Sequence, residues 1–357
     1  MKHLFFIFSF WGLVSGIFAQ EKITLLFAGD LMQHKAQIDA AKSGGGYDYS
    51  GYFDFVKEEI SKADLAIGNL EVTLGGKPYR GYPAFSAPDE YLTAIKEAGF
   101  DVLVTANNHC LDSGKKGLER TVKMLDSLGI THAGTYPDAA GREKEYPLIL
   151  DKNGFRIALL NYTYGTNGIT VTAPNVVNYI DKAVIEQDIE KARTFRPDLV
   201  IAVMHWGTEY QLLPDGSQKE LADWLIANGV DHVIGSHPHV VQPLELRENV
   251  DSVSGNVVLY SLGNYISNMS APNTDGGIMF KMEFRKHNDM VRLTDCGYSL
   301  VWTSRPKLSG KKNFRLYPAA NPPLPLTPAE ANRLKIFVES ARRLFKEHNK
   351  GIGEYIF

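Results

Sequence analysis

The sequence is poor in cysteine, because only Cys110 and Cys296 occur in 357 residues. Two cysteines so far apart do not form a disulfide framework, and we predict that both are unpaired. The chain also lacks an excess of charge, with a net charge of −3 and no acidic or basic tail. Nucleic-acid-binding proteins carry a basic surface, so no nucleic-acid partner is expected. No low-complexity segment stands out, and the function has to be inferred from a site.

The first 20 residues, MKHLFFIFSFWGLVSGIFAQ, combine a short basic start, an apolar stretch and a small-residue end near Ala19. This pattern predicts a signal peptide over residues 1–20, which would export the chain to the periplasm or the cell surface. The alternative is an uncleaved membrane anchor, although the apolar run is short for a bilayer span. The rest of the chain is long enough to bury a large core.

Helical segments alternate along the chain with short apolar runs that end in polar residues. These runs lie in SKADLAIGNLE, AGFDVLVTANNH, RPDLVIAVMHWG and NGVDHVIGSHPH, and also in KITLLFAGD, FRIALLNYTY and NVVLYSLGN. Short β-branched runs between helices predict buried strands, so we expect an α/β fold with a parallel or mixed sheet. In the helical segment DGSQKELADWLIANGV, Ser217 and Glu220 predict a capping box, and Asn228-Gly229 predicts the helix end.

The pattern changes at about residue 276. The segments GGIMFKMEFRKH and MVRLTDCGYSLVWTSRP alternate like antiparallel strands, and a Pro-rich stretch then leads to a terminal amphipathic helix. We therefore predict a main domain over residues 21–275. Residues 276–357 are expected to form strands and a helix that pack on that same domain.

Five of the predicted strands end in side chains that can bind a metal ion. In sequence order they are Asp30, Glu71, Asn108 with His109 and Asp112, His205, and the pair His237 and His239. Each has an ordinary alternative, such as a turn or helix cap for an Asp or a half-buried position for His205. However, ligands of α/β sheets bind beyond the carboxyl ends of strands, where all of these side chains fall. Carboxylate, imidazole and amide ligands suit Mn, Fe or Zn better than a thiolate site would.

Six segments make the sequence resemble the CapA-type capsule (poly-γ-glutamate) synthesis proteins, a branch of the calcineurin-like metallophosphoesterase superfamily. The segments are FAGDLM, AIGNLEVTL, TANNHCLDSG, VMHWGTEY, GSHPHVVQP and YSLGNYISN, in the family's order from about residue 23 to the 280s. The resemblance implies a four-layer α/β/β/α sandwich with a metal centre at the strand ends. It also implies hydrolysis of an ester or phosphoester, assisted by one or two divalent ions.

The resemblance assigns roles to individual residues. It implies that Glu71 stands where the superfamily usually has a bridging aspartate, and that His109 protonates the leaving oxygen. The implied metal ligands are Asp30, Glu71, Asn108, His205, His237 and His239.

The sequence also departs from the superfamily pattern. Met32 stands where ordinary phosphoesterases have a ligand histidine, and GNLE replaces the usual aspartate motif of the second strand, so a single ion is also plausible. His34 is a candidate to compensate for Met32, with a helix-face or surface position as the alternative. The SLGN signature, with Ser261 and Asn264, has no chemical role that we can assign from the sequence, and Gly263 is compatible with a simple turn.

Two functions are compatible with these features. The first is an exported metal-dependent hydrolase that acts on a phosphoester or an envelope polymer. The second is a non-catalytic, metal-containing component of capsule or poly-γ-glutamate assembly that binds or exports an anionic polymer. Either would be expected to associate with membrane-bound capsule synthesis machinery. Likeness of fold cannot choose between them, because function depends on the site.

Overall fold

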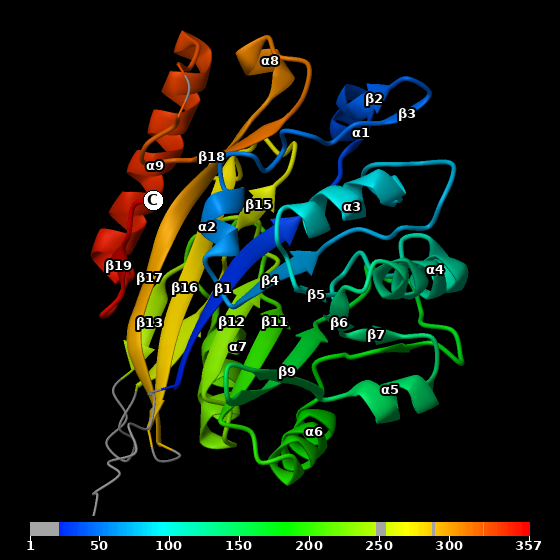
Figure 1. Ribbon diagram of the computed structural model, residues 1–357, viewed down its shortest axis with the longest axis vertical. Coiled ribbons are helices and arrows are strands. Elements are labelled where there is room, and N and C mark those ends of the chain that lie inside the picture. Colours follow the sequence, from blue (N-terminus) through cyan, green and yellow to red (C-terminus); the bar gives the residue numbers. More distant parts are fainter. Residues whose placement is uncertain (1–20, 248–254, 288–289, 324) are drawn as a thin grey trace, which may run out of the picture.

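The computed structural model of the chain describes residues 21–247, 255–287, 290–323 and 325–357. The predicted signal peptide, residues 1–20, lies outside the described residues. Two β-sheets pack face to face, and helices cover both outer faces (Figure 1). The predicted four-layer α/β/β/α sandwich is therefore the observed architecture.

The first sheet is mixed and runs in the order β18-β17-β16-β1-β4-β5-β6, with β15 paired to β1 and β19 paired to β17. Strands β1, β4, β5 and β6 are parallel, whereas β16 is antiparallel to β1. The strand bounds are β1 Glu21–Leu31, β4 Leu65–Leu70, β5 Val102–Val104, β6 Thr131–Ala133, β15 Asn264–Ile266, β16 Gly276–His287, β17 Met290–Ser304, β18 Arg315–Pro318 and β19 Gly353–Glu354. The strands that follow residue 275 thus extend the same sheet as β1.

The second sheet runs in the order β13-β14-β12-β11-β9-β8. Its four central strands are parallel, and β8 and β13 add antiparallel edges. The bounds are β8 Leu148–Lys152, β9 Phe155–Thr163, β11 Leu199–His205, β12 His232–Ser236, β13 Leu244–Arg247 and β14 Asn256–Leu259. Two small ribbons pair β2 (Lys42–Ser43) with β3 (Gly46–Tyr47) and β7 (Thr135–Tyr136) with β10 (Val176–Val177).

Helices α1 to α4 pack on the outer face of the first sheet, and α6 and α7 pack on that of the second. The long helix α9 lies beside β17 and adds its apolar face to the inter-sheet core (Figure 1). The helix bounds are α1 Lys35–Ala41, α2 Lys57–Ser61, α3 Asp89–Glu97, α4 Gly114–Ser127, α5 Ala139–Glu145, α6 Lys182–Thr194, α7 Gly216–Ala227, α8 Pro306–Ser309 and α9 Pro328–His348. Within the described ranges, no helix is both long and apolar enough to span a bilayer.

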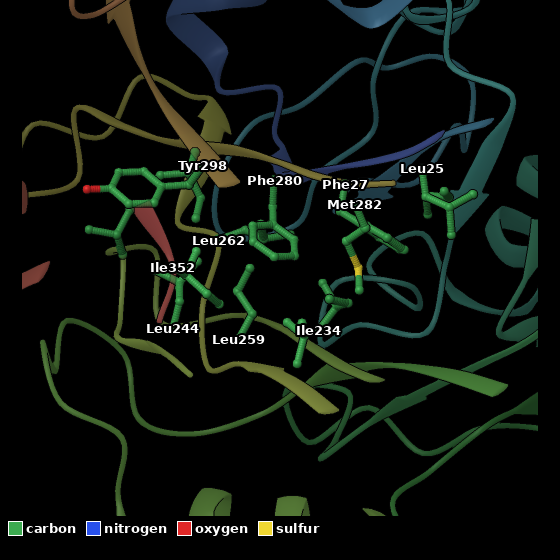
Figure 2. Close-up of a cluster of buried hydrophobic side chains, with 14 of the residues drawn as sticks. Leu25, Phe27, Ile234, Leu244, Leu259, Leu262, Phe280, Met282, Tyr298 and Ile352 are labelled. Atoms are coloured by element: carbon green, nitrogen blue, oxygen red, sulfur yellow. The ribbon is translucent and has the colours of Figure 1, made fainter. Parts of the chain in front are cut away.

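The alternation of side chains along β1 separates two parts of the core. Leu25 and Phe27 point into the space between the sheets, where they meet Ile234 and Leu259 of the second sheet (Figure 2). Leu26, between them in sequence, packs on the helix side. Because full burial of such a side chain is worth about 1.5–3 kcal/mol, this packing fixes the two sheets against each other. The site at their strand ends is therefore built on a rigid base.

The start of α7 differs from the prediction. The capping box is formed by Asp215 and Gln218, in which Asp215 Oδ1 accepts from Gln218 N at 2.9 Å and Gln218 Oε1 accepts from Asp215 N at 3.0 Å. The predicted pair of Ser217 and Glu220 was wrong, because the helix begins at Gly216 and Ser217 already lies in its first turn. The predicted end is confirmed, since Asn228 is the residue that closes the helix.

Candidate metal centre

Strands of both sheets contribute side chains, at or just after their C-terminal ends, to one buried cluster. Asp30 and Glu71 come from the ends of β1 and β4, in the first sheet. His205 ends β11, and His237 and His239 follow β12, in the second sheet. All five are at most 3% exposed. The sandwich thus brings together ligand types that are up to about two hundred residues apart in the sequence.

Their ligand atoms form two groups that share one carboxylate. We call Glu71, His205 and His237 the His237 group, and Asp30, Glu71 and His239 the His239 group. Within each group the ligand atoms lie within 4.8 Å of one another. Glu71 Oε1 is 3.5 Å from His205 Nε2 and 3.8 Å from His239 Nε2. Glu71 therefore lies where a carboxylate could contact ions in both groups.

Asn108 extends the His237 group. Its Oδ1 lies 2.9 Å from His205 Nε2, while its Nδ2 donates to Asn167 Oδ1 at 3.3 Å. Without a cation, this 2.9 Å contact is a hydrogen bond from His205 Nε2–H to the amide oxygen, and Asn69 Nδ2 can donate to His205 Nδ1 at 3.3 Å. A cation would require the other tautomer, with the proton on Nδ1, where Ser236 Oγ, 3.1 Å away, can accept it. The lone pair of Nε2 and the amide oxygen of Asn108 could then share one cation.

Several of these atoms have no hydrogen-bond partner although they are buried. Among the described residues this holds for Asp30 Oδ2, both carboxylate oxygens of Glu71 and His237 Nδ1. Leaving a buried polar atom unsatisfied costs about 1–3 kcal/mol, so such a cluster needs an explanation. Hard and borderline donors that converge without partners are what a divalent ion of the Mn, Fe or Zn class requires. The residues present therefore fit such an ion.

The protonation states agree with this fit. Burial, with the neighbouring Asp30 carboxylate, raises the pKa of Glu71 well above its usual value. Burial, with the other histidines nearby, lowers the pKa of His205 well below its usual value and that of His237 to about 3. Both imidazoles are therefore neutral, which is the form that binds metals, and a cation would restore the charged form of Glu71.

The bend that carries His237 and His239 has an uncommon backbone. Their φ angles are 100° and 59°, in the left-handed region that residues other than glycine rarely adopt. The carbonyl of Pro238, between them, accepts a hydrogen bond from Tyr210 N at 2.9 Å, and Tyr210 also has a positive φ of 66°. Each such residue costs of the order of 1–3 kcal/mol and is usual at functional sites. The bend brings both imidazoles to the centre.

Asn264, from the SLGN segment, orients His239. Its amide nitrogen donates to His239 O at 3.2 Å and to Thr274 O at 3.0 Å, so its Oδ1 faces His239 Nδ1 at 3.1 Å. His239 Nδ1, which is also 3.2 Å from Asp30 Oδ2, therefore carries the proton. The lone pair of Nε2 is left facing Glu71. The structure thus supplies the role for Asn264 that the sequence could not.

Gly263, next to Asn264, forms a turn with a φ of 69°, in agreement with the simple interpretation from the sequence. Its carbonyl also accepts a hydrogen bond from Asp30 N at 3.0 Å. A Cβ atom at Gly29 would lie only 2.0 Å from that carbonyl oxygen. Glycine at position 29 is therefore required for the close approach that joins the end of β1 to the SLGN segment.

His109, the predicted acid, belongs to neither ligand group. Its Nδ1 lies 2.8 Å from Asp112 Oδ2, which also accepts from Phe85 N at 2.7 Å. Asp112 therefore holds the Nδ1 proton and leaves Nε2 free for proton transfer. The ring is 4% exposed and packs edge-on to Phe85, with the ring centroids 4.6 Å apart. Asp112 thus orients the imidazole of His109 and also caps the backbone N–H of Phe85.

Neither Met32 nor His34 completes the His239 group. Met32 is buried in the apolar cluster between the first sheet and its helices. His34 is the N-cap residue of α1. It belongs to neither ligand group, so the structure does not place it as a replacement ligand for Met32. Among the described residues, Asp30, Glu71 and His239 are thus the three acidic or histidine side chains of that group that could bind an ion.

Two other side chains at the centre were not predicted as site residues. Asn69 Nδ2 donates to Asp30 Oδ1 at 2.8 Å and so holds that carboxylate. Tyr164 is 48% exposed, and its ring centroid lies 4.6 Å from that of His237. Both follow the signal used for the other residues, since each is a polar residue at the end of a predicted strand. The position at a strand end therefore identified the region of the site, but it did not show which of the polar residues there take part.

The four-layer α/β/β/α sandwich is similar in fold to solved structures of a nucleotidase and a phosphoesterase. The NAD nucleotidase NadN of Haemophilus influenzae superposes with a TM-score of 0.51 at 14% identity, covering 95% of this chain and 65% of that chain, and the likeness concerns the fold alone. The calcineurin-like phosphoesterase YfkN of Bacillus subtilis superposes with a TM-score of 0.49 at 13% identity, covering 91% and 98%.

The chain belongs to the family described as bacterial capsule synthesis protein PGA_cap, which matches residues 24–269. It is 28% identical over 284 residues to the capsule biosynthesis protein CapA of Bacillus anthracis, covering 76% of this chain and 66% of that protein. It is 26% identical over 279 residues to the PGA biosynthesis protein CapA of Bacillus subtilis, covering 76% and 70%. The match thus spans about two thirds of these relatives, and the resemblance to CapA-type proteins is confirmed.

Proposed function

We propose that the chain is a metal-dependent phosphoester hydrolase that acts in the synthesis of capsule or poly-γ-glutamate. The observation that carries the proposal is the pair of ligand groups that share Glu71, with its two carboxylate oxygens buried and unpartnered. The biological setting is supported by the names of the two CapA relatives, which refer to capsule and to PGA biosynthesis.

The proposed metal ligands and the proposed proton donor have separate roles in the reaction. Divalent ions would neutralise charge on the phosphoryl group and lower the pKa of a water molecule. Asp112 holds the proton on His109 Nδ1, so that a proton on Nε2 can be given to the leaving oxygen. The proposed ligands that would hold one or two ions are Asp30, Glu71, Asn108, His205, His237 and His239.

A second candidate function has one specific observation in its favour. Met32 leaves the His239 group with three acidic or histidine ligands, and an ion held there would be bound more weakly than one with a fourth ligand. A protein that keeps one ion without turnover could serve as a non-catalytic component that binds or exports an anionic polymer. Here the exposed ring of Tyr164 would contact the polymer rather than a phosphoester.

The two candidates are separated by metal content and turnover. We would measure metals in the purified protein and then the hydrolysis of an aryl phosphate with Mn, Fe or Zn added. Turnover that is lost in Glu71→Gln, while the exposed control Asn332→Ala keeps it, would support the hydrolase. Bound metal without hydrolysis of aryl phosphate monoesters or diesters would contradict it and favour the polymer-binding component.

We also propose that the chain is exported, on the basis of the pattern in residues 1–20, and that it works with membrane-bound capsule synthesis machinery. Cleavage near Ala19 is expected to release a chain into the periplasm or onto the cell surface. N-terminal sequencing of the exported material tests this. A protein that still begins at Met1 would instead be a membrane-anchored one.

A further inference from the structure

We propose that His34 forms an oxyanion-binding subsite beside the metal centre, with its Nε2–H as the hydrogen-bond donor to a phosphoryl oxygen. The inference rests on the proposed function and deepens it, because it assigns a substrate contact that is not a metal ligand. His34 lies between β1 and α1, four residues after Asp30.

Hydrogen bonds at His34 Nδ1 indicate which ring nitrogen carries the proton. The backbone N–H of Asn268 points at His34 Nδ1 from 3.3 Å, and a backbone N–H can only donate. This bond uses the lone pair of Nδ1 and places the proton of the neutral ring on Nε2. Gln37 Oε1, also 3.3 Å from Nδ1, could accept only from the other tautomer. Gln37 Oε1 already accepts from His34 N at 2.8 Å, whereas the N–H of Asn268 has no other acceptor among the described residues, so we assign the tautomer with the proton on Nε2.

The other ring nitrogen, His34 Nε2, is free to contact a ligand. The described residues provide no hydrogen-bond partner for it, and it is not among the fully buried unpartnered atoms. A metal ligand would need a lone pair at this nitrogen, whereas the tautomer set by Asn268 puts a proton there. His34 is thus built to donate a hydrogen bond rather than to replace the missing ligand at Met32.

The His34 ring and the predicted acid share one aromatic neighbour. Phe85 packs edge-on with two imidazoles, with centroid distances of 5.2 Å to His34 and 4.6 Å to His109. Burial lowers the pKa of His34 to about 4; the contact with Gln37 opposes this shift, and positive charge on His239 or His109 adds to it. The ring is therefore neutral near pH 7, and the shared contact with Phe85 puts it in the neighbourhood of the predicted acid. We place one oxygen of a bound phosphoryl group at His34 Nε2.

The choice of a phosphoryl oxygen follows from the chemistry of this region. A phosphate monoester carries three non-bridging oxygens, so one can accept a hydrogen bond from the protein while others face the ions. A neutral N–H can donate a hydrogen bond to an anion without adding a buried positive charge to the protein, which would need its own counter-ion. A hydrogen bond to a charged group is typically worth about a 10-fold to 100-fold change in affinity.

The test compares the metal-replete wild type with His34→Ala and His34→Gln by titration calorimetry with inorganic phosphate. We expect His34→Ala to bind phosphate about 10-fold to 100-fold more weakly, and His34→Gln, which keeps an N–H donor, to recover part of the loss. Metal content should not change, because His34 is not a ligand in this assignment and the backbone bond from His34 N to Gln37 remains. The control is His348→Ala at the exposed end of α9, which should bind like the wild type.

Unchanged phosphate affinity in His34→Ala would overturn the inference, and so would a wild type that binds no phosphate. Loss of metal in His34→Ala would instead make His34 a ligand. A titration with glutarate tests whether the subsite binds the carboxylates of an anionic polymer instead. If His34→Ala weakened the binding of glutarate but not that of phosphate, the assignment to a phosphoryl oxygen would be refuted. If the wild type binds phosphate but hydrolyses no ester, the proposed hydrolysis fails while the same affinity comparison still decides the role of His34.

Discussion

Oε1 of Glu71 lies 3.5 Å from Nε2 of His205, although Glu71 follows a strand of the first sheet and His205 ends a strand of the second. The contact crosses the interface of the sandwich, where both side chains are almost fully buried. Glu71 is also the residue common to the two ligand groups. The metal content of the protein should therefore depend on Glu71 more than on any ligand that belongs to one group.

Glu71→Gln is expected to deplete metal from both groups, because an amide is a poorer ligand than a carboxylate and cannot bridge with two anionic oxygens. Asp30→Asn should affect only the His239 group. Metal analysis after dialysis checks both variants. In the presence of a chelator, Glu71→Gln should be at least as stable as the wild type, because burial raises the pKa of Glu71 and opposes its charge. Full metal occupancy in Glu71→Gln would contradict the assignment.

His237→Ala and His239→Ala are each expected to remove metal from one group. An ion that binds only the folded state stabilises it by about 2.7 kcal/mol when its concentration is 100 times the Kd. Each variant should therefore lose thermal stability mainly in metal-replete buffer, and the difference from the wild type should shrink after chelation. Differential scanning calorimetry with and without metal measures this. An equal loss in both buffers would indicate that the histidines act only in packing.

Asn264→Ala is expected to weaken metal binding about 10-fold to 100-fold without removing a ligand, because it frees His239 to rotate and to change tautomer. Competition with a chromogenic chelator gives the affinity. The matched control is Asn332→Ala on the exposed face of α9, for which no change is expected. If Asn264→Ala bound metal as tightly as the control, the orienting role of Asn264 would be wrong.

His109→Gln should keep its metal and lose turnover by about 100-fold to 10,000-fold, the usual contribution of general acid catalysis. The loss should be smaller for substrates with good leaving groups, which need little protonation. Steady-state rates across a series of aryl phosphates, together with metal analysis, provide the measurement. Loss of metal would recast His109 as a ligand, and unchanged turnover of poor leaving groups would exclude it from the chemistry.

His232 gives a pH dependence that is independent of the metal. The ring is 2% exposed and accepts from Val257 N at 3.0 Å, and burial lowers the pKa of His232 to about 3. Between about pH 6.5 and about pH 3 only the unfolded state binds this proton, so stability falls as the pH falls. One proton corresponds to about 1.4 kcal/mol per pH unit.

The comparison for His232 uses His232→Asn, whose side-chain oxygen can still accept the bond from Val257 but does not titrate. Urea unfolding of chelated protein between about pH 4 and about pH 6 should give a less steep loss of stability in the variant. The difference in slope should correspond to about one proton, whatever the absolute stability of the variant. Parallel slopes would show that His232 is protonated in the folded state as well.

The sequence alone predicted much of the fold, because its signals are local. A buried parallel strand reads as a short apolar run, and the polar residues that follow β1, β4, β5, β11 and β12 stand directly after such runs. The same local signals pointed to Asp30, Glu71 and the histidine pair as one site. They failed at the start of α7, where two capping-box patterns overlap within six residues and the helix begins after Asp215 rather than after Ser217.

Only the tertiary structure determined which of these residues contact one another and therefore which role each can have, because the spacing of residues along the chain does not give distances between the two sheets. It brought Glu71 next to His205, two residues that belong to different sheets. It also placed Asn264 where its side-chain oxygen can accept the Nδ1 proton of His239, and Asp112 where it can accept that of His109. It also decided the role of His34. The sequence places that residue four positions after Asp30, but its ring proton is set by a backbone N–H more than two hundred residues away. Hydrogen bonds act over about 3 Å and depend on direction, so they exist only once the sheets have packed.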